Sequence, residues 1–437
     1  MQNVIALLIL LLAITTFAQK SLLQSGPMLG ATEMRESMLW VQTTKSAQVK
    51  FVYWDKEKPA EKFETKSITT REEDAFAATL IADKVEPGRV YGYKLYINNK
   101  PVDLPYRNEF KTLKLWQWRE DPPEINFVAG SCAYINETRY DRPGKPYGSE
   151  YEIYTSVYNK KPDFMVWMGD NMYLREVDWN TRTGILKRST HTRSLPELQP
   201  LFGSVHNYAI WDDHDFGPNN SDMSYIHKEK TLEAFKLFWP MPSYGINGKP
   251  GITSSFQWGD TEFFMLDNRY YRTPNDRKTG KREMFGDEQI QWLINALVNS
   301  SAPFKFVVAG GQMLNPVAKY ENYSTYPEEQ AKLLSLIKEE NIPGVIFLSG
   351  DRHHSEITKM ERQGTYPLYD ITSSSLTAGV FTLEENNQWR VGEPIKQHNF
   401  ALFNISGPRK DRVLKCTFYD KDGKEIRSIN IKASELK

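Results

Sequence analysis

The sequence predicts an α+β protein with two regions: an all-β region over residues 19–118 and a mixed, layered region over residues 124–437. Short runs with strand-like alternation recur up to about residue 115, whereas apolar strands alternate with helical stretches from residue 125 onward. A polar, proline-containing stretch at residues 116–123 separates the two patterns. The length of 437 residues suits two or three domains, because a domain commonly holds about 150 residues.

The first region alternates apolar and polar residues as half-buried strands do. Examples are SMLWVQTT, QVKFVYW and RVYGYKLYIN, with turn signals between such runs at Lys58-Pro59 and Glu86-Pro87-Gly88. Strands that recur at this spacing predict a β-sandwich of the immunoglobulin or fibronectin type.

The second region has strands and helices in alternation, which predicts a layered α/β or α+β domain with both sheet faces covered. We expect strands over residues 125–133, 163–170, 207–215, 255–267, 304–312, 344–351 and 368–375. We expect helices over residues 150–160, 228–239, 287–298 and 328–340, and a return to strands over 400–406, 413–420 and 425–432.

Composition narrows the classes of protein. Lys and Arg number 55, as do Asp and Glu, and this zero net charge argues against specific nucleic-acid recognition through a basic field. A chain with 40% hydrophobic and 25% charged residues is a globular protein rather than a disordered or fibrous one. Its two cysteines, Cys132 and Cys416, exclude a disulfide scaffold but leave open a single bridge or a role for one thiolate.

Residues 1–18 have the pattern of a secretory signal peptide. The apolar run over residues 4–17 is too short to span a bilayer comfortably and ends in Thr16-Phe17-Ala18, after which we expect cleavage. An uncleaved anchor is the alternative, because no lysine or arginine precedes the run. No later segment is long and apolar enough to span, so we expect a secreted or periplasmic protein with no transmembrane segment after signal removal.

Polar, ligand-capable residues follow most of the predicted strands of the second region. They are Ser131-Cys132, Asp170-Asn171 with Tyr173, Asp212-Asp213-His214-Asp215, Asp267-Asn268-Arg269, Gly311-Gln312 and Asp351-Arg352-His353-His354. Sites in open α/β sheets form beyond the carboxyl ends of the strands, so these residues predict a metal centre at one sheet edge. Two ions about 3.5–4 Å apart, bridged by one carboxylate, would lower the pKa of a bound water and clamp a phosphoryl group.

Taken singly, these motifs have simpler explanations. Gly169-Asp170 could be an ordinary strand exit, and Cys132 could be a core residue or pair with Cys416. The run Asp212–Asp215 is harder to explain without a cation, because three carboxylates around one histidine repel one another. The remaining histidines lack such neighbours and are interpreted as surface or structural residues: His191, His206, His227 and His398.

The order of six motifs carries a resemblance to a known family. GSC, GDxxY, WDDHD, LDxRxYR, GxxQxxWL and GDRHHSE follow one another along the chain. In this the sequence resembles the alkaline phosphatase D (PhoD-like) metallophosphatases of the calcineurin-like and purple acid phosphatase group. The resemblance covers essentially the whole chain after the signal peptide. It implies a four-layer αββα catalytic domain over residues 124–437, preceded by a β-sandwich.

The resemblance also implies a centre of ferric iron (Fe3+) and calcium (Ca2+), although other divalent ions could serve. By position in the motifs, Cys132 and Tyr173 resemble iron ligands, and Asp170 resembles the bridging carboxylate. Asp213 stands where the wider superfamily has a metal-binding Asn, Asp351 where it has a His, and His353 at the last ligand position. Gln312 lies where the wider group often places a His, and it completes the implied ligand set. The chain lacks the DxH and GNH motifs of the wider superfamily, which is itself typical of the PhoD-like branch.

Substrate-facing roles follow from the same resemblance. His214 resembles the histidine that stabilises or protonates the leaving group, and Arg269 resembles a phosphate-facing catalytic arginine. Arg272, Asn171 and His354 are the further residues assigned to substrate binding. The segments 239–244 and 320–326 are aromatic, and either form the rim of the site or pack in the core.

The function implied is a secreted, metal-dependent phosphoesterase that hydrolyses phosphate monoesters or diesters through a metal-activated hydroxide. Its substrates would be small phosphate esters or phosphodiester polymers, and we expect a monomer. The first alternative is a phosphodiesterase or phospholipase D-type hydrolase of extracellular polymers or lipids. The second is a non-catalytic polymer-binding protein built on the same scaffold.

Overall fold

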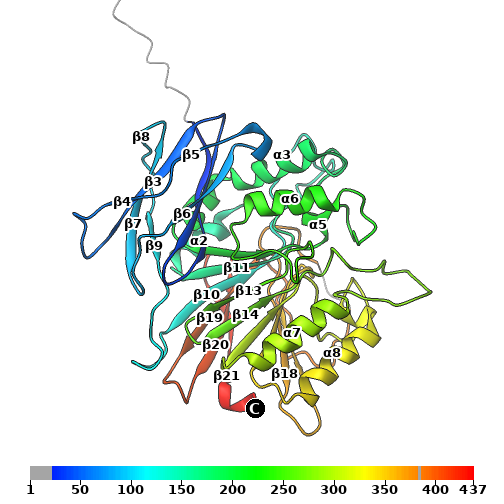
Figure 1. Cartoon of the computed structure of the whole chain (residues 1–437). Helices are drawn as coiled ribbons and strands as arrows, with labels where there is room; N and C mark the ends of the chain where they lie inside the picture. Colours follow the sequence, from blue (N-terminus) through cyan, green and yellow to red (C-terminus); the bar gives the residue numbers. More distant parts are fainter. Residues whose placement is uncertain (1–21, 382–384) are drawn as a thin grey trace, which may run out of the picture.

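The computed structural model describes residues 22–381 and 385–437, and its nine-stranded sheet faces one of its two six-stranded sheets (Figure 1). The predicted signal peptide at residues 1–18 therefore lies outside the described residues. The larger sheet has nine strands in the order β21-β20-β19-β10-β11-β12-β1-β2-β6, and the second has six in the order β13-β14-β15-β16-β18-β17. The two sheets position the site, because each contributes a block of parallel strands.

In the nine-stranded sheet, the central strands β10 (Ile125–Gly130), β11 (Phe164–Met168) and β12 (His206–Ile210) run parallel. The predicted C-terminal strands are confirmed as β19 (Asn399–Ser406), β20 (Val413–Asp420) and β21 (Glu425–Lys432), which continue antiparallel from β10. In the six-stranded sheet, the parallel block is β14 (Thr261–Met265), β15 (Phe304–Val308), β16 (Val345–Ser349) and β18 (Leu368–Thr372). The antiparallel edge strands β13 (Ser254–Trp258) and β17 (Glu356–Met360) flank it.

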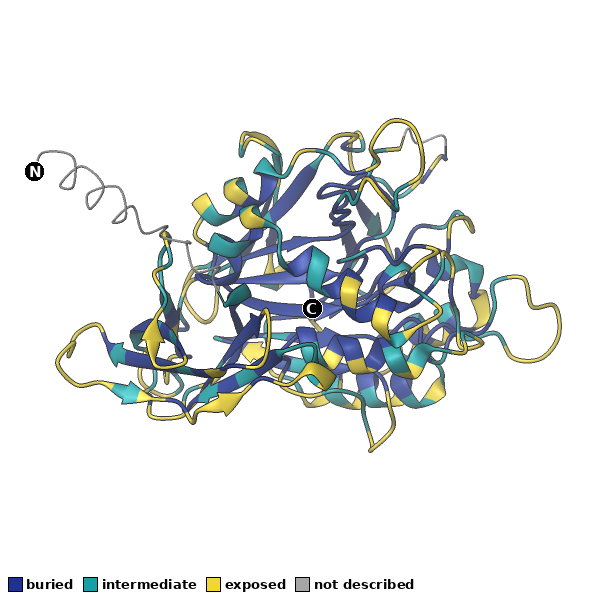
Figure 2. Cartoon of the chain, turned by 90° about the horizontal axis from the view of Figure 1, so that it is seen from above, coloured by how far each residue is buried: buried dark blue, intermediate teal, exposed yellow. Residues whose placement is uncertain are grey.

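An aromatic core joins the two sheets. The Phe127 ring on β10 meets Phe263 on β14 and Phe306 on β15 edge-on, with ring centroids 5.1 and 5.2 Å apart. Successive strand residues point to opposite faces, so the next residue, Phe264, faces outward and packs on Trp292 of α7. On the other sheet, Trp167 of β11 likewise packs on Tyr154 of α2. The strands are therefore buried on both faces, as their apolar sequences predict (Figure 2).

Helices cover the outer faces and complete four layers. On the side of the nine-stranded sheet lie α2 (Glu152–Asn159), α3 (Arg182–Arg193), α4 (Gln199–Phe202) and α6 (Lys228–Phe238); α7 (Asp287–Asn299) and α8 (Pro327–Glu339) cover the six-stranded sheet (Figure 1). The short helices are α5 (Asp213–Phe216) and the 3-10 turns Glu72–Asp74, Pro196–Leu198, Tyr323–Thr325 and Ala433–Glu435. Among the described residues, no helix combines the length and the apolar character needed to cross a membrane.

The sequence analysis did not predict α3, because of the composition of this helix. The buried side of α3 includes Arg188, Ser189, Thr192 and Arg193 instead of an apolar stripe. Arg188 is held by an ion pair with Asp178 at 2.8 Å. Ion pairs of this kind allow polar side chains to be buried. The helix therefore lacks the regular spacing of apolar residues by which a helix is predicted from sequence.

The N-terminal region is β-rich and two-layered, but it shares a sheet with the rest of the chain. Its strands β1 (Leu23–Thr32), β2 (Ser37–Thr43) and β6 (Ala77–Ala82) extend the nine-stranded sheet, with Leu29 of β1 paired to His206 of β12. The second layer consists of β3 (Gln48–Asp55), β4 (Phe63–Glu64), β5 (Ile68–Thr69), β7 (Val90–Ile97), β8 (Lys100–Pro101) and β9 (Glu109–Lys111). One apolar cluster, including Leu29, Leu39 and Phe51, joins the layers. The immunoglobulin or fibronectin type and the domain boundaries remain predictions.

The two cysteines are not bridged. Cys132 and Cys416 are both buried and free, so the structure closes the disulfide alternative that the sequence left open. Cys416 lies on β20 opposite Phe403 of β19, inside the main core, whereas Cys132 directly follows the end of β10.

His206 ties the N-terminal strands to the parallel block. Its Nδ1 donates to the carbonyl of Gly30 at 2.8 Å, and the backbone N–H of Lys111 donates to its Nε2 at 3.3 Å. The neutral imidazole satisfies both contacts, and burial lowers the pKa of His206 to about 4. His206 is thus a structural residue, as its lack of polar company in the sequence predicted.

We predict that His206 contributes to acid destabilisation. Because its pKa is below the ordinary 6.5, the unfolded chain binds a proton first, and stability falls by about 1.4 kcal/mol per pH unit between about pH 6.5 and pH 4. Urea unfolding at pH 7 and pH 5 should therefore show a smaller acid loss, by about 2 kcal/mol, in His206→Gln than in the parent. His227→Gln, at a partly buried histidine, is the control. Equal acid losses in His206→Gln and the parent would contradict the assignment.

Candidate metal centre

The site forms where the parallel strands of both sheets end. Cys132 follows β10, Asp170 follows β11, Asp213 follows β12, and Asp351 and His353 follow β16. Four of these five have left-handed backbone: φ is 61° at Cys132, 53° at Asp170, 65° at Asp351 and 54° at His353. Residues other than glycine adopt this conformation at a cost of about 1–2 kcal/mol, and such residues cluster at functional sites. Three of the four strands, β10, β11 and β16, therefore end in a sharp turn that keeps the polar residues at the sheet edge.

The ligand-capable atoms form three groups, each within 4.8 Å. The first is Cys132, Asp170 and His353; the second is Asp170, Asp213 and His214; the third is Asp212, Asp213 and Asp351. Asp170 and Asp213 each belong to two groups, so the three groups form one continuous cluster. The sequence therefore predicted the convergence of five strand-end residues, and it gave Asp212 no ligand role.

Tyr173 completes the first group. Its hydroxyl donates to Asp170 Oδ2 at 3.0 Å and lies 3.2 Å from His353 Nε2. The thiol of Cys132 lies 3.7 Å from the same Asp170 oxygen and accepts a hydrogen bond from Ser374 Oγ at 3.1 Å. A thiol, a phenol, an imidazole and a carboxylate thus surround one point, which is a donor set suited to iron-like or borderline cations.

The His353 ring is held from two sides. Its Nδ1 hydrogen-bonds with the carbonyl of Gly379, which leaves Nε2 directed to Tyr173. Phe381 stacks on the ring with centroids 4.8 Å apart. A carbonyl partner on one ring nitrogen fixes the tautomer and orients the other nitrogen, as is usual for histidines that ligate metals.

The second and third groups contain buried polar atoms that no described residue satisfies. Asp212 Oδ2, Asp213 Oδ1 and His214 Nδ1 have no hydrogen-bond partner among the described residues. His214 packs against Tyr173 with ring centroids 4.3 Å apart, and its backbone N–H donates to Asp170 Oδ1 at 3.3 Å. Buried polar atoms normally have partners, so these three fit a site completed by a cation.

The carboxylates also repel one another. Burial, and then the charge of Asp213, holds the pKa of Asp170 well above its ordinary value. Burial and the neighbouring Asp212 raise the pKa of Asp351 to about 8. Asp213 differs: burial acts to raise its pKa, but His214 and Arg269 lower it below the ordinary value. A multivalent cation would stabilise all three as carboxylates, and it would also ionise Cys132, whose pKa burial raises to about 12.

Arg269 and Arg272 lie behind the carboxylates and do not line the cleft. Arg269 contacts Asp212 at 2.5 Å and Glu321 at 2.9 Å, and Arg272 contacts Glu321 at 3.1 Å. Both arginines are 0% exposed. The two arginines therefore do not face the cleft, where a phosphate group would bind. Their charges instead balance the buried carboxylates of Asp212 and Glu321. Sequence could not show this, because Glu321 comes from a distant loop.

Gln312 is occupied by protein partners. Its amide nitrogen donates to Glu356 at 2.7 Å and Thr372 at 3.0 Å. Its oxygen accepts from Arg352 at 2.6 Å and Asn315 at 2.8 Å, which uses both lone pairs. The structure therefore places Gln312 outside the three ligand groups, as part of a polar network beside them.

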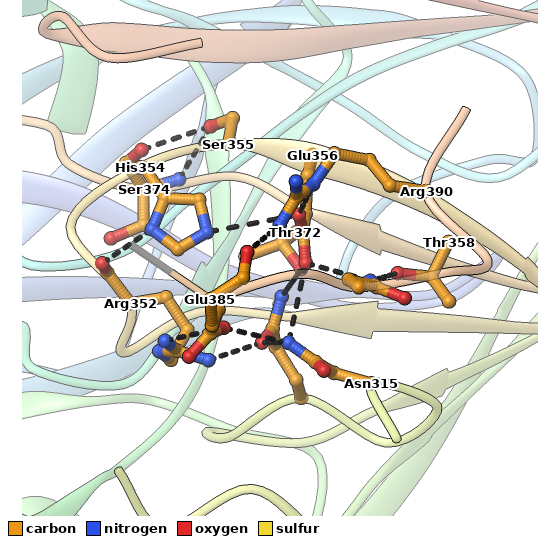
Figure 3. Close-up of polar contacts among 12 residues, drawn as sticks. Asn315, Arg352, His354, Ser355, Glu356, Thr358, Thr372, Ser374, Glu385 and Arg390 are labelled. Atoms are coloured by element: carbon orange, nitrogen blue, oxygen red, sulfur yellow. Dashed lines mark hydrogen bonds and ion pairs between the residues drawn. The ribbon is translucent and has the colours of Figure 1, made fainter. Parts of the chain in front are cut away.

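Figure 3 shows this network, which supports the turn after β16. Arg352 pairs with Glu385 at 2.8 Å, and the carbonyl of Arg352 meets His354 Nδ1 at 2.9 Å. His354 is buried at the cleft wall, with Nε2 3.9 Å from Glu356. Asn171, the other residue assigned to substrate binding, donates instead to the carbonyl of Ile210 at 2.7 Å and does not line the cleft.

A cleft of about 800 Å³ opens over the centre. Its lining includes the predicted residues Asp170, Tyr173, His214, Asp351, His353 and His354. It also includes residues without a role in the sequence analysis: Tyr134, Arg142, Lys145, Tyr147, Arg175, Lys319, Glu321, Arg352, Phe381 and Glu385. Most of these come from loops, where no periodicity or motif marks them.

The two aromatic segments have different outcomes. In the segment 239–244, Trp239 and Met241 are buried in the main core, so core packing is the correct alternative there. In the segment 320–326, Tyr323 and Tyr326 are also buried, but Tyr320 lines the cleft. One residue of the predicted rim is therefore at the rim.

Two family models match the chain. "PhoD-like phosphatase" covers residues 127–406, and "Domain of unknown function (DUF7800)" covers residues 20–115. Among curated proteins, alkaline phosphatase D of Bacillus subtilis (strain 168) is 24% identical over 325 residues, which is 63% of this chain and 52% of that protein. The match thus spans about half the length of the curated relative.

Two solved structures share the fold. The structure of PhoD aligns with a TM-score of 0.76 and 17% identity, covering 94% of this chain and 92% of that one. The purple acid phosphatase PPD1 from yellow lupin (Lupinus luteus) seeds aligns with a TM-score of 0.67 and 14% identity, covering 93% of this chain and 74% of that one. The chain therefore shares its mixed α/β fold with these two structures, which confirms the coarse fold class. Because the first family model covers more than half of the chain, the chain belongs to the PhoD-like phosphatase family.

We predict that Glu321 stabilises the fold through the two buried arginines. Glu321→Ala leaves Arg269 and Arg272 without a shared carboxylate, and removing one partner of a buried ion pair costs about 3–5 kcal/mol. Urea unfolding measures this loss. Glu328→Ala, at an exposed position, is the control. If Glu321→Ala unfolds at the same urea concentration as Glu328→Ala, the arginines are not held as described.

Proposed function

We propose that the protein is a metal-dependent phosphoesterase. The observation that carries this proposal is the sharing of Asp170 and Asp213 among three ligand groups, each of which has at least one residue that lines the cleft. Shared carboxylates suit two adjacent cations, which is the arrangement of many phosphate-ester hydrolases. Membership of the PhoD-like phosphatase family supports the same activity.

The residues present fit two cations of different character. Cys132, Tyr173, His353 and Asp170 would hold the first, for which we propose ferric iron. Asp213 and Asp351 would hold the second, for which we propose calcium, with Asp212 close enough to contribute; Asp170 would link the two positions, because it shares a group with Asp213. When bound, such ions supply Lewis-acid activation of water and neutralise phosphoryl charge.

His214 is the residue placed to handle the leaving group. It lines the cleft, its ring is fixed against Tyr173, and its Nδ1 lacks a partner among the described residues. An imidazole in this position can donate a proton to the departing alcohol oxygen. Arg175 and Arg352 line the cleft, whereas Arg269 and Arg272 do not; because Arg352 is paired with Glu385, we assign the contact with the phosphoryl oxygens to Arg175.

The substrate is a monoester or a diester. The size of the cleft, about 800 Å³, favours diesters as a second candidate, because it leaves room for a second ester group. We further propose that the protein is secreted or periplasmic, because residues 1–18 have the composition of a signal peptide.

The first prediction of this proposal is chelator-sensitive hydrolysis. The purified protein should release the aryl alcohol from an aryl phosphomonoester, the matching bis-aryl diester, or both, at alkaline pH with added calcium. The ratio of the two rates separates monoesterase from diesterase. A chelator should remove the activity, and metal analysis should show iron and calcium in the active protein. Absence of hydrolysis by metal-loaded protein would favour the non-catalytic, polymer-binding alternative.

The second prediction separates metal binding from turnover. Asp170→Asn should lose metal content and activity together, because Asp170 belongs to two of the ligand groups. His214→Ala should retain metal and lose turnover by about 100-fold or more, the usual size of a general-acid contribution. Metal content and kcat are measured on the same preparations. Unchanged kcat in His214→Ala would remove its catalytic role.

A further inference from the structure

Three exposed aromatic rings stand at the mouth of the cleft. Tyr147 is 38% exposed, Phe381 is 54% exposed and Tyr320 is 68% exposed, and all three line the cleft. They come from three separate segments of the chain. Large rings that gather with exposed surface around one cavity usually mark a binding surface, whereas exposed apolar residues scattered singly need no explanation.

Each ring is anchored to a residue of the site. Phe381 stacks on His353 with centroids 4.8 Å apart, and the Tyr147 hydroxyl lies 3.3 Å from His353 Nδ1. The Tyr320 ring packs against the Arg352 guanidinium at 5.1 Å. The rings are thus held in place before any ligand arrives, beside the position where the ester bond would break. A flat group bonded to that ester would lie within their reach.

Exposed cations surround the same mouth. Arg142, Lys145 and Lys319 line the cleft and are exposed. Within residues 22–381 and 385–437, no carboxylate lies within 4.0 Å of their charged nitrogens. Some other exposed lysines have such a partner, as Lys332 has in Asp287 at 2.5 Å, whereas others, such as Lys410, have none among the described residues. Free cations set away from the ligand groups favour a second negative charge on the bound molecule, apart from the ester under attack.

We propose that the cleft selects phosphate esters whose alcohol part carries both a planar ring and a second anionic group, which is the chemistry of a nucleotide. The proposal rests on the proposed phosphoesterase function and adds its substrate class. The ring would pack on Phe381, Tyr147 and Tyr320, and the second anion would approach Arg142, Lys145 and Lys319. Stacking of a base on an aromatic side chain accounts for about tenfold to 100-fold in binding.

Three substrates with the same primary-alcohol leaving group test this proposal. Ribose 5-phosphate has neither feature, adenosine 5′-monophosphate adds the ring, and adenosine 3′,5′-bisphosphate adds the second phosphate. We expect kcat/KM to rise at each step, by about tenfold or more for the ring. If the protein cleaves only diesters, the 5′-methyl esters of the three compounds replace them. Equal kcat/KM for ribose 5-phosphate and adenosine 5′-monophosphate overturns the proposal.

Variants of the residues at the mouth of the cleft test whether these residues cause the increase in kcat/KM. Phe381→Ala and Tyr320→Ala should each reduce the ratio of adenosine 5′-monophosphate to ribose 5-phosphate, and Lys319→Ala should reduce only the gain from the second phosphate. Trp118→Ala and Lys410→Ala are matched controls at an exposed ring and an exposed lysine outside the cleft, and should leave both ratios unchanged. Ratios that persist in every rim variant overturn the proposal. Hydrolysis of the aryl ester in that case keeps the proposed function, whereas hydrolysis of no ester overturns both.

Discussion

Mutual repulsion among buried carboxylates is the constraint on which the site depends. Asp170, Asp212, Asp213 and Asp351 meet where little water screens their charges, and among the described residues Arg269 is the one cation in contact with Asp212. At such separations in a medium of low polarity, each added negative charge costs far more than it would in water. One arginine cannot balance four acids. Bound cations would keep Asp170 and Asp351 ionised near neutral pH, and this links the fold to its proposed chemistry.

The fold holds the acids together by rigid means. Two blocks of parallel strands end at the same place because an aromatic layer around Phe127 locks the sheets face to face. Left-handed turns at Cys132, Asp170 and Asp351 then keep the ligands at the strand ends. Turns of this kind are unfavourable by themselves and persist where the surrounding structure determines them. The densely packed, buried strands on either side hold these turns in place.

The sequence predicted the parts of this site that follow from strand direction. Parallel strands place their carboxyl ends at one edge of the sheet, so the sequence alone predicted that Cys132, Asp170 and Asp351 lie close together. It could not predict which way the longer side chains turn. Arg269 follows its strand as the ligands do, yet it points to Glu321, whose position is set by a loop that no local pattern describes. The partners of Gln312 likewise belong to other strands and loops, which no local pattern shows. The continuation of the nine-stranded sheet into the N-terminal region depends on one long-range pairing, Leu29 with His206, and long-range register leaves no local signal.

The site therefore has two parts that obey different rules. Its floor is built from strand ends, where a change in any ligand disturbs charge balance and packing together. Its rim is built from loops, where Tyr147, Tyr320 and Phe381 keep exposed surface and bury little of the core. Residues of the rim can vary at small cost in stability, because loops tolerate substitution and their side chains hold no sheet in place. On the proposed function, the strand ends would therefore set the reaction, and the loops would set the choice of substrate.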